Sequence, residues 1–168
     1  GSTDLPSFYR QFPGMVISAT INKFVYITIN PTKYYSDDIV VKYKETEIVH
    51  RPEELRHTRL RAALLMDGIT KGGLEITSLA DLPAGTGLGS SSSFTSPLLK
   101  GLGTLQNKHL SKKTLADKAC KLEIDVIKDA IGKQDQYAAA YGGLNIIGFN
   151  SDDTVEVSPL LLDDKDLN

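Results

Sequence analysis

Residues 82–93, with the sequence LPAGTGLGSSSS, combine the residue types that a phosphate-binding loop requires. The alternating glycines Gly85, Gly87 and Gly89 permit positive φ angles and let a ligand approach the backbone closely. The hydroxyls that follow can donate hydrogen bonds to phosphate oxygens or bind Mg²⁺, which prefers oxygen ligands. A flexible Gly/Ser connector is the alternative. An apolar helix expected directly after the loop favours an anion site at the N-terminus of that helix.

Three well-known phosphate loops do not match this spacing. A Walker A loop needs Lys after its last glycine, where this sequence has Ser90. A dinucleotide fingerprint reads G-x-G-x-x-G, whereas this loop reads G-x-G-x-G. The glycine loop of protein kinases is followed by a strand, whereas a helix is expected here. The sequence therefore indicates a phosphate loop of another kind.

The bulk composition is that of one globular domain of 168 residues, with 40% hydrophobic and 24% charged residues. Nineteen basic residues oppose 21 acidic ones, and this balance argues against a nucleic-acid partner. The apolar runs are too short to span a bilayer, so no membrane partner is expected. The single cysteine, Cys120, cannot form an internal disulfide and suits the reducing cytoplasm, which is the predicted location.

The elements that must hold this loop alternate between strand and helix patterns. Strands are predicted over 15–30 (one long strand, or two that meet near Asn22), 39–43, 47–50, 74–78, 144–149 and 154–157. Helices are predicted over 53–66, 90–105, 111–127 and 135–141. Pro97 should kink the second of these helices or mark a later start. In the third, Ser111 is the expected cap, and Leu115, Ala119, Leu122 and Val126 share one face. Antiparallel hairpins at both ends of the chain predict an α+β fold.

Pro83 to Ser91 (PAGTGLGSS) resembles the second motif of the GHMP kinases, which reads P-x-x-x-G-L-G-S-S. The resemblance implies an N-terminal ATP-binding domain over residues 1–160, with 161–168 as an acidic tail or the start of a further domain. The expected fold is a mixed sheet with helices packed on one side, shared with a ribosomal-protein domain. ATP would be the bound nucleotide. Its predicted contacts are Pro83, Ala84, Gly85, Thr86, Gly87, Leu88, Gly89, Ser90, Ser91 and Ser92.

The same resemblance assigns Mg²⁺ to Glu123 and to the hydroxyls of Ser90 and Ser91. Glu123 lies twelve residues before Asp135, as the metal-holding acid does in related kinases. The alternative for Glu123 is an ordinary surface carboxylate. Asp125, two residues further along the helix, points away from Glu123 and is the expected solvated neighbour.

The segment Gly132-Lys-Gln-Asp-Gln136 resembles the family segment whose aspartate acts as the catalytic base, and this assigns Asp135 as base and substrate contact. The alternative is that Asp135 caps the short helix that follows. Thr3 and Asp4 match a Thr-Asp pair that contacts the sugar in related kinases. Lys133 could neutralise phosphate charge, but a solvated lysine is the simpler expectation.

Beyond the loop, TDLPSFY, SLADLPAGTGLGSSSSF and IGKQDQYAAAYGGLN resemble the D-glycero-D-manno-heptose 7-phosphate kinase branch of the family. This implies ATP-dependent phosphorylation of the anomeric hydroxyl of a sugar phosphate. Two alternatives remain: another GHMP sugar kinase, acting on fucose or galactose, and a non-catalytic nucleotide- or sugar-binding module. Members of the family also carry a C-terminal domain that this sequence lacks. That domain is an expected partner, and the chain is active either alone or only together with it.

Overall fold

A computed structural model describes residues 2–83 and 87–161, so the predicted contacts at Ala84, Gly85 and Thr86 and the tail over 162–168 lie outside the described residues. The helices are α1 (Pro6–Tyr9), α2 (Thr58–Met66), α3 (Ser90–Leu105), α4 (Lys112–Cys120) and α5 (Gln134–Tyr141), with a 3₁₀ turn at Pro52–Glu54 and a π-helical segment, η2, at Lys121–Val126. The strands are β1 (Gly14–Ala19), β2 (Val25–Pro31), β3 (Ile39–Lys42), β4 (Thr46–Val49), β5 (Leu74–Ala80), β6 (Leu144–Phe149) and β7 (Val155–Pro159). The predicted α+β class is confirmed.

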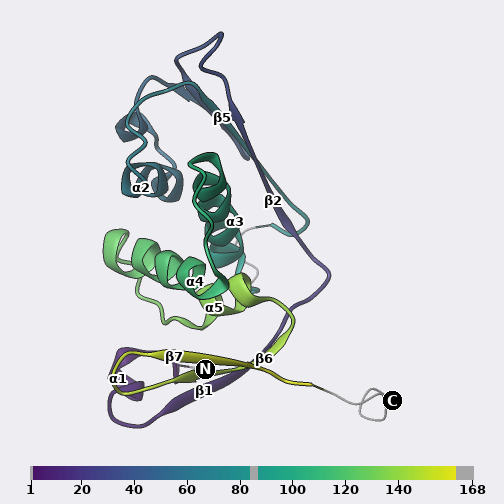
Figure 1. The fold of residues 1–168 in the computed structure, drawn as a ribbon, viewed down its shortest axis with the longest axis vertical. Coiled ribbons are helices and arrows are strands. Elements are labelled where there is room, and N and C mark those ends of the chain that lie inside the picture. Colours follow the sequence, from purple (N-terminus) through teal and green to yellow (C-terminus); the bar gives the residue numbers. More distant parts are fainter. Residues whose placement is uncertain (1, 84–86, 162–168) are drawn as a thin grey trace.

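The described strands divide between two sheets. One is antiparallel with the order β1-β6-β7, and the other is mixed with the order β2-β5-β3-β4, in which β3 and β5 run parallel. The predicted segment 15–30 is therefore two strands, one in each sheet. In Figure 1 the four-stranded sheet lies at the top and the three-stranded sheet at the bottom, with α2, α3, α4 and α5 on one side.

Each sheet buries its own apolar core against the helices. In the four-stranded sheet, Ile39, Val41 and Ile76 pack against leucines of α2 and α3. In the three-stranded sheet, Ile147 and Phe149 pack against side chains from α1, α4 and α5. Both clusters follow the period-two and period-3.6 burial expected of strands and helices. The ends of α3 and α5 meet where the two sheets adjoin (Figure 1).

Three helix predictions need correction. The helix expected from residue 53 begins at Thr58, after a 3₁₀ turn, and the side chain of His57 caps it by accepting from the Leu60 N–H. Pro97 lies inside a helix that begins at Ser90, so the alternative of a later start is wrong. The helix predicted over 111–127 changes to π geometry at Lys121. This wider winding shifts the helical phase, and Val126 is 46% exposed instead of sharing the buried face.

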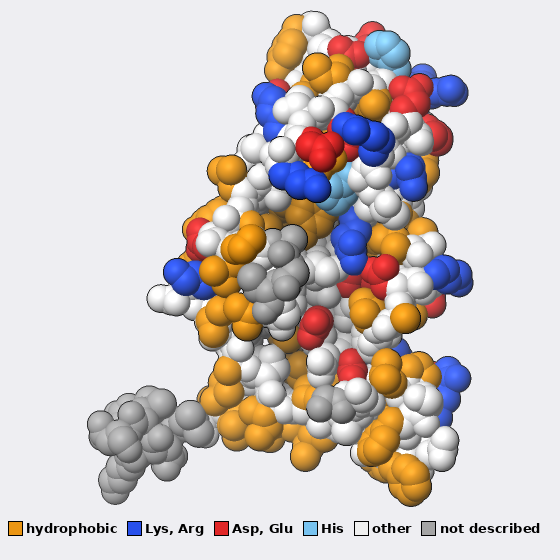
Figure 2. Space-filling model, turned by 180° about the vertical axis from the view of Figure 1, so that it is seen from behind, with side chains coloured by type: hydrophobic (Ala, Val, Ile, Leu, Met, Phe, Trp, Pro, Cys, Tyr) orange, Lys and Arg blue, Asp and Glu red, His pale blue; other side chains and the backbone are white. Residues whose placement is uncertain are grey.

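The outer face of the three-stranded sheet is apolar and exposed. Met15 and Ile17 of β1 are 63% and 67% exposed, and Ile17 pairs with Ile146 of β6. Hydrophobic side chains gather over this end of the molecule in Figure 2. No helix in the described part of the chain is long and apolar enough to cross a membrane.

Candidate functional site

The described end of the glycine loop delivers the chain into the N-terminus of α3. Gly89 is the N-cap residue and has a φ of 68°, a left-handed conformation that glycine adopts without steric cost. The Ser93 N–H then donates to the Gly89 carbonyl over 2.9 Å and closes the first helical turn. The positive end of a sixteen-residue helix is thereby placed at the loop, as an anion site requires.

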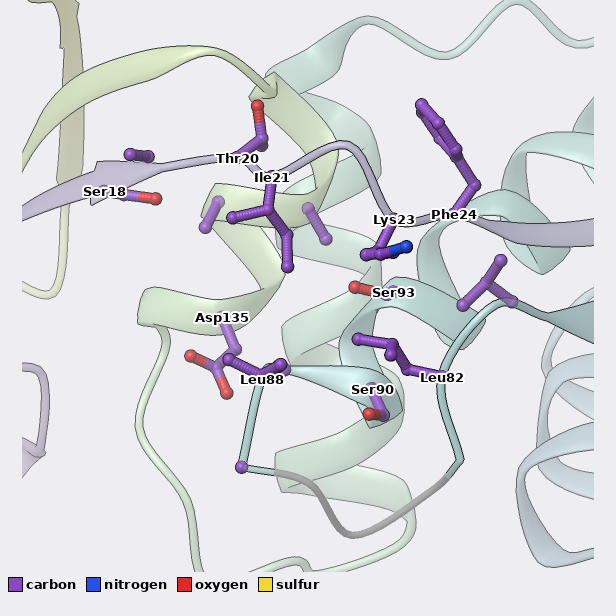
Figure 3. A pocket seen from close by; sticks show the side chains of 16 residues that line it. Ser18, Thr20, Ile21, Lys23, Phe24, Leu82, Leu88, Ser90, Ser93 and Asp135 are labelled. Atoms are coloured by element: carbon purple, nitrogen blue, oxygen red, sulfur yellow. The ribbon is translucent and has the colours of Figure 1, made fainter.

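This helix start opens onto a cavity of about 300 Å³. Its floor comes from Gly87, Leu88 and Gly89 of the loop and from Ser90 and Ser93 of α3. The end of β1 and the chain between β1 and β2 form one wall, which includes Ile21, Lys23 and Phe24. The apolar side chains suit a flat ring and the helix start suits phosphate. Figure 3 shows Lys23, Ser90, Ser93 and Asp135 around the same space.

Asp135 lies in the first turn of α5 and faces this cavity (Figure 3). It also lines a second cavity, together with Asp4 and Gly132. The surrounding protein raises the pKa of Asp135, first by desolvation and then through the negative charges of Asp4 and Glu123. The N-cap position of α5 belongs to Lys133, whose own side chain makes no capping hydrogen bond, so Asp135 is not the N-cap of this helix. The carboxylate of Asp135 is thus positioned between two spaces that ligands could occupy.

Asp4 is buried, 4% exposed, and packs against the segment that leads into α5. Its Oδ2 accepts from the Gln134 N–H over 3.1 Å. A Cβ on Gly132 would lie 1.8 Å from that oxygen, so the close approach requires glycine. The Thr3 hydroxyl donates instead to the Met15 carbonyl over 3.1 Å, which joins the N-terminal segment to β1. Of the predicted Thr-Asp pair, the structure places Asp4 beside Asp135.

Glu123 is fully buried, so the alternative of a surface carboxylate is wrong. Its Oε1 accepts from the hydroxyls of Ser91 (2.8 Å) and Thr95 (2.6 Å), and its Oε2 accepts from Ser92 Oγ (2.9 Å) and Gln136 Nε2 (2.6 Å). Burial tends to raise the pKa of Glu123, but these four hydrogen bonds together bring it below the ordinary value. The carboxylate is therefore ionised at neutral pH. Asp125 is exposed, as predicted.

The predicted serines divide between two environments. Ser90 lines the cavity, whereas the hydroxyls of Ser91 and Ser92 point inward to Glu123. Lys133 donates to the Asp153 carbonyl and lies over the Tyr9 ring, so in this structure it is neither a site residue nor a freely solvated lysine.

Two residues of the site, Arg59 and Lys23, were not predicted. Arg59 of α2 places Nε 3.4 Å from Glu123 Oε1 and Nη2 2.6 Å from Asp129 Oδ2. Lys23 and Ser93 line the main cavity. Ser93 belongs to the serine run whose hydroxyls the sequence predicted as phosphate donors. Arg59 and Lys23 carry no motif, and only the folded chain brings them to the loop.

The oxygen atoms near the loop are of the types that bind a hard cation, because they belong to serine hydroxyls and an ionised carboxylate. Within the described ranges, no cluster of three or more His, Cys, Asp or Glu could hold a metal ion. Oε2 of Glu123 accepts two hydrogen bonds and Oε1 accepts three, the third from Arg59 Nε at 3.4 Å, which fills the lone pairs of a carboxylate. Direct bonding of Mg²⁺ to Glu123 would therefore require one of these donors to move.

Comparison with known proteins gives a consistent result. The sequence profile described as GHMP kinases N terminal domain matches residues 56–143. A Campylobacter jejuni protein named D-glycero-alpha-D-manno-heptose 7-phosphate kinase is 27% identical over 169 residues, which is 95% of this chain and 50% of that protein.

Solved structures extend the likeness to the fold. A Bacteroides thetaiotaomicron D-glycero-D-manno-heptose 1-phosphate kinase superimposes with a TM-score of 0.86 at 27% identity, covering 97% of this chain and 56% of that one. A Lactococcus lactis galactokinase gives a TM-score of 0.69 at 20% identity, covering 89% and 42%, and shares the fold alone. The chain spans about half the length of these relatives.

Proposed function

This chain belongs to the GHMP kinases, and we propose that it is the ATP-binding half of a sugar-phosphate kinase. The proposed reaction transfers the γ-phosphate of ATP to the anomeric hydroxyl of D-glycero-D-manno-heptose 7-phosphate. The names of the two relatives at 27% identity support a heptose phosphate as acceptor. GHMP kinases use ATP as donor, and the cavity at the α3 N-terminus is the proposed nucleotide site. A cytoplasmic location remains a prediction.

One observation carries this proposal: Asp135 borders both cavities. The larger cavity contains the glycine loop and would hold the donor. The smaller contains Asp4 and would hold the acceptor sugar. A carboxylate between them is placed to act on a hydroxyl that attacks a phosphorus atom. Desolvation and the neighbouring negative charges raise its pKa, which brings it closer to that of a useful general base.

The proposed chemistry follows from these positions. The acceptor oxygen forms a bond to the γ-phosphorus as the bond from that phosphorus to the bridging oxygen breaks, and ADP leaves with that oxygen. Asp135 takes the proton of the acceptor hydroxyl. The N-terminus of α3 and the ammonium group of Lys23 offset the negative charge of the phosphates. Catalysis of this type consists mostly of positioning and charge stabilisation.

A magnesium ion would neutralise further phosphate charge when bound with ATP. Ser90 and Ser91 would supply hydroxyl oxygens to it. Glu123 would hold it directly after exchange of one donor, or through its hydrogen bond to Ser91. We assign these three residues to the metal as a proposal.

The proposal is tested by incubating the chain with Mg-ATP and a panel of free and phosphorylated sugars, with transferred phosphate read by mass spectrometry. We expect transfer to heptose 7-phosphate, and a fall of about 10²- to 10⁴-fold in Asp135→Asn. Asp125→Asn, an exposed aspartate on η2, is the matched control. Transfer to fucose or galactose instead would reassign the acceptor within the family.

The second candidate function is a non-catalytic nucleotide- or sugar-binding module, which would use the same cavity at the α3 N-terminus without transferring phosphate. ATP binding measured by calorimetry without any transfer would support this module and contradict catalysis by the chain alone. Absence of both ATP binding and sugar binding would contradict both candidates.

A further inference from the structure

The buried carboxylate of Glu123 joins three helices at one point. Ser91, Ser92 and Thr95 reach it from the first turns of α3, and Gln136 reaches it from α5. Arg59 reaches it from α2. α3 is the helix whose N-terminus faces the larger cavity, and α5 is the helix that carries Asp135. The two sides of the proposed site therefore share one acceptor.

Gln136 makes this sharing specific, because it follows Asp135 in the chain. Its Nε2 donates to the oxygen that also accepts from Ser92. Gln136 is fully buried, and no partner for its Oε1 is present among the described residues, so the bond to Glu123 is the polar contact that fixes this side chain. A change at Ser92 therefore affects the oxygen to which Gln136 donates, and a change at Gln136 affects the oxygen to which Ser92 donates.

Arg59 supplies the opposite charge that a buried carboxylate needs. Its guanidinium lies between Glu123, with Nε at 3.4 Å, and Asp129, with Nη2 at 2.6 Å. The Arg59 side chain is 29% exposed, so it connects the buried acid to the surface. Glu123 itself lies in the π-helical segment η2, where it is buried together with its neighbour Leu122.

We propose that Glu123, Gln136 and Arg59 are positioning residues that couple the phosphate-binding start of α3 to the base-bearing start of α5. In this role Glu123 acts through its hydrogen bonds, whether or not it ever touches a metal ion. Donors that share one buried acceptor are linked through it, because removing one of them changes the position and charge of the carboxylate that the others meet, and such a contiguous set of contacts can carry coupling between sites. The assignment of α3 and α5 to donor and base rests on the proposed function, but the coupling itself does not.

Amide hydrogen exchange on the ligand-free chain tests the coupling directly. Gln136→Leu removes the donor on α5, and we expect exchange in the first turns of α3, around Ser91 to Thr95, to become about tenfold faster. Gln106→Leu is the matched control, because Gln106 donates to the Asp67 carbonyl at the far end of α3. Unchanged protection of the α3 start in Gln136→Leu would overturn the proposal.

A conservative variant separates coupling from loss of packing and serves if Gln136→Leu fails to fold. In Gln136→Glu a protonated carboxyl can donate to Glu123, whereas an ionised one repels it. We expect protection of the α3 start to return as the pH is lowered, before global acid unfolding begins. A pH-independent protection factor in this variant would contradict the assigned bond.

The catalytic consequence is read separately. If the chain transfers phosphate, Gln136→Leu should lower kcat about tenfold and change the KM for ATP less than twofold, because Asp135 is displaced while the loop remains. Unchanged kcat would overturn the positioning of the base. If no transfer occurs, the proposed function fails, and the exchange experiment still decides the coupling because it uses neither nucleotide nor sugar.

Discussion

Two carboxylates that lie twelve residues apart in the sequence occupy opposite environments in this chain. Glu123 is enclosed, and the protein supplies all the donors that its oxygens can accept from. Asp135 is exposed to the cavities, with Asp4 and Glu123 as negative neighbours. Hydrogen bonds lower the pKa of the first below its ordinary value, whereas desolvation and like charge raise the pKa of the second.

In Glu123 the protein itself supplies the hydrogen-bond donors of the carboxylate, whereas in Asp135 the carboxylate remains available to a ligand. A group whose donors come from the protein holds structure together and has little capacity left for chemistry. A group held near like charge, with fewer hydrogen bonds than its charge needs, costs stability, and such sites are common where function is located. Variants that neutralise one acid or the other should therefore have opposite effects on the stability of the fold.

The largest expected effect on stability comes from substitution of Glu123, whose donors the protein supplies. Glu123→Gln keeps the shape but turns an acceptor oxygen into a donor facing buried donors, and it removes the counter-charge of Arg59. We expect a loss of about 3 kcal/mol in the free energy of unfolding, measured by urea denaturation.

Glu156→Gln, on the exposed side of β7, should change this value little. If Glu123→Gln were as stable as the parent chain, the Glu123 carboxylate would not stabilise the fold as proposed.

The stability contribution of Glu123 should depend on pH. Because the folded pKa of Glu123 lies below its ordinary value of 4.5, its ionised form stabilises the fold at higher pH, and this contribution is lost as the pH falls through the folded pKa. The stability difference between the parent chain and Glu123→Gln should be constant above about pH 5 and should shrink in more acid solution. Denaturation series at several pH values would measure it, and a difference that grows toward acid would reverse the assignment.

A smaller effect is expected at Lys23, which lies on the ligand side of the comparison. Lys23→Ala should weaken Mg-ATP binding by about three- to tenfold, more at low salt than at high salt, because its charge is exposed and screened. Stability should hardly change. Calorimetric titration would measure the affinity, with the exposed Lys71→Ala as control. Equal affinities would remove Lys23 from the proposed nucleotide site.

The smallest effect is expected at Asp135 itself. The folded pKa of Asp135 is above the ordinary 3.8, so its ionised form costs stability at neutral pH. This cost is lost as the pH falls through the folded pKa and is absent below pH 3.8. Asp135→Asn should therefore raise the Tm at pH 7 by about 1 °C or less, since exposure weakens the effect, and the gain should vanish in acid. Scanning calorimetry at two pH values would test it, and a lowered Tm at pH 7 would show that the fold depends on this carboxylate.

Sequence patterns predicted most of the fold, because period-two strands and period-3.6 helices follow from burial on one face. The π-helical segment was missed, since residues 121–126 read as ordinary helix and nothing in their types marks the wider turn. For the same reason Glu123 could be placed on a helix but not in the interior.

In the candidate site, the loop and Asp135 could be proposed from motif resemblance, and the burial of Glu123 could not. Arg59 and Lys23 were beyond prediction, because single basic residues carry no signature and their contacts depend on how α2 and the β1–β2 connection pack.

The bond between Asp4 and the backbone of Gln134 spans 130 residues of sequence. A contact of this separation closes a long loop, and the entropy of that closure must be overcome before the contact contributes anything. During synthesis Asp4 leaves the ribosome long before Gln134 exists, so its segment lacks this contact until then. The start of α5 therefore makes its full set of contacts only after nearly the whole described chain has been synthesised. Asp4 and Asp135 are brought together at that late stage of folding and not before.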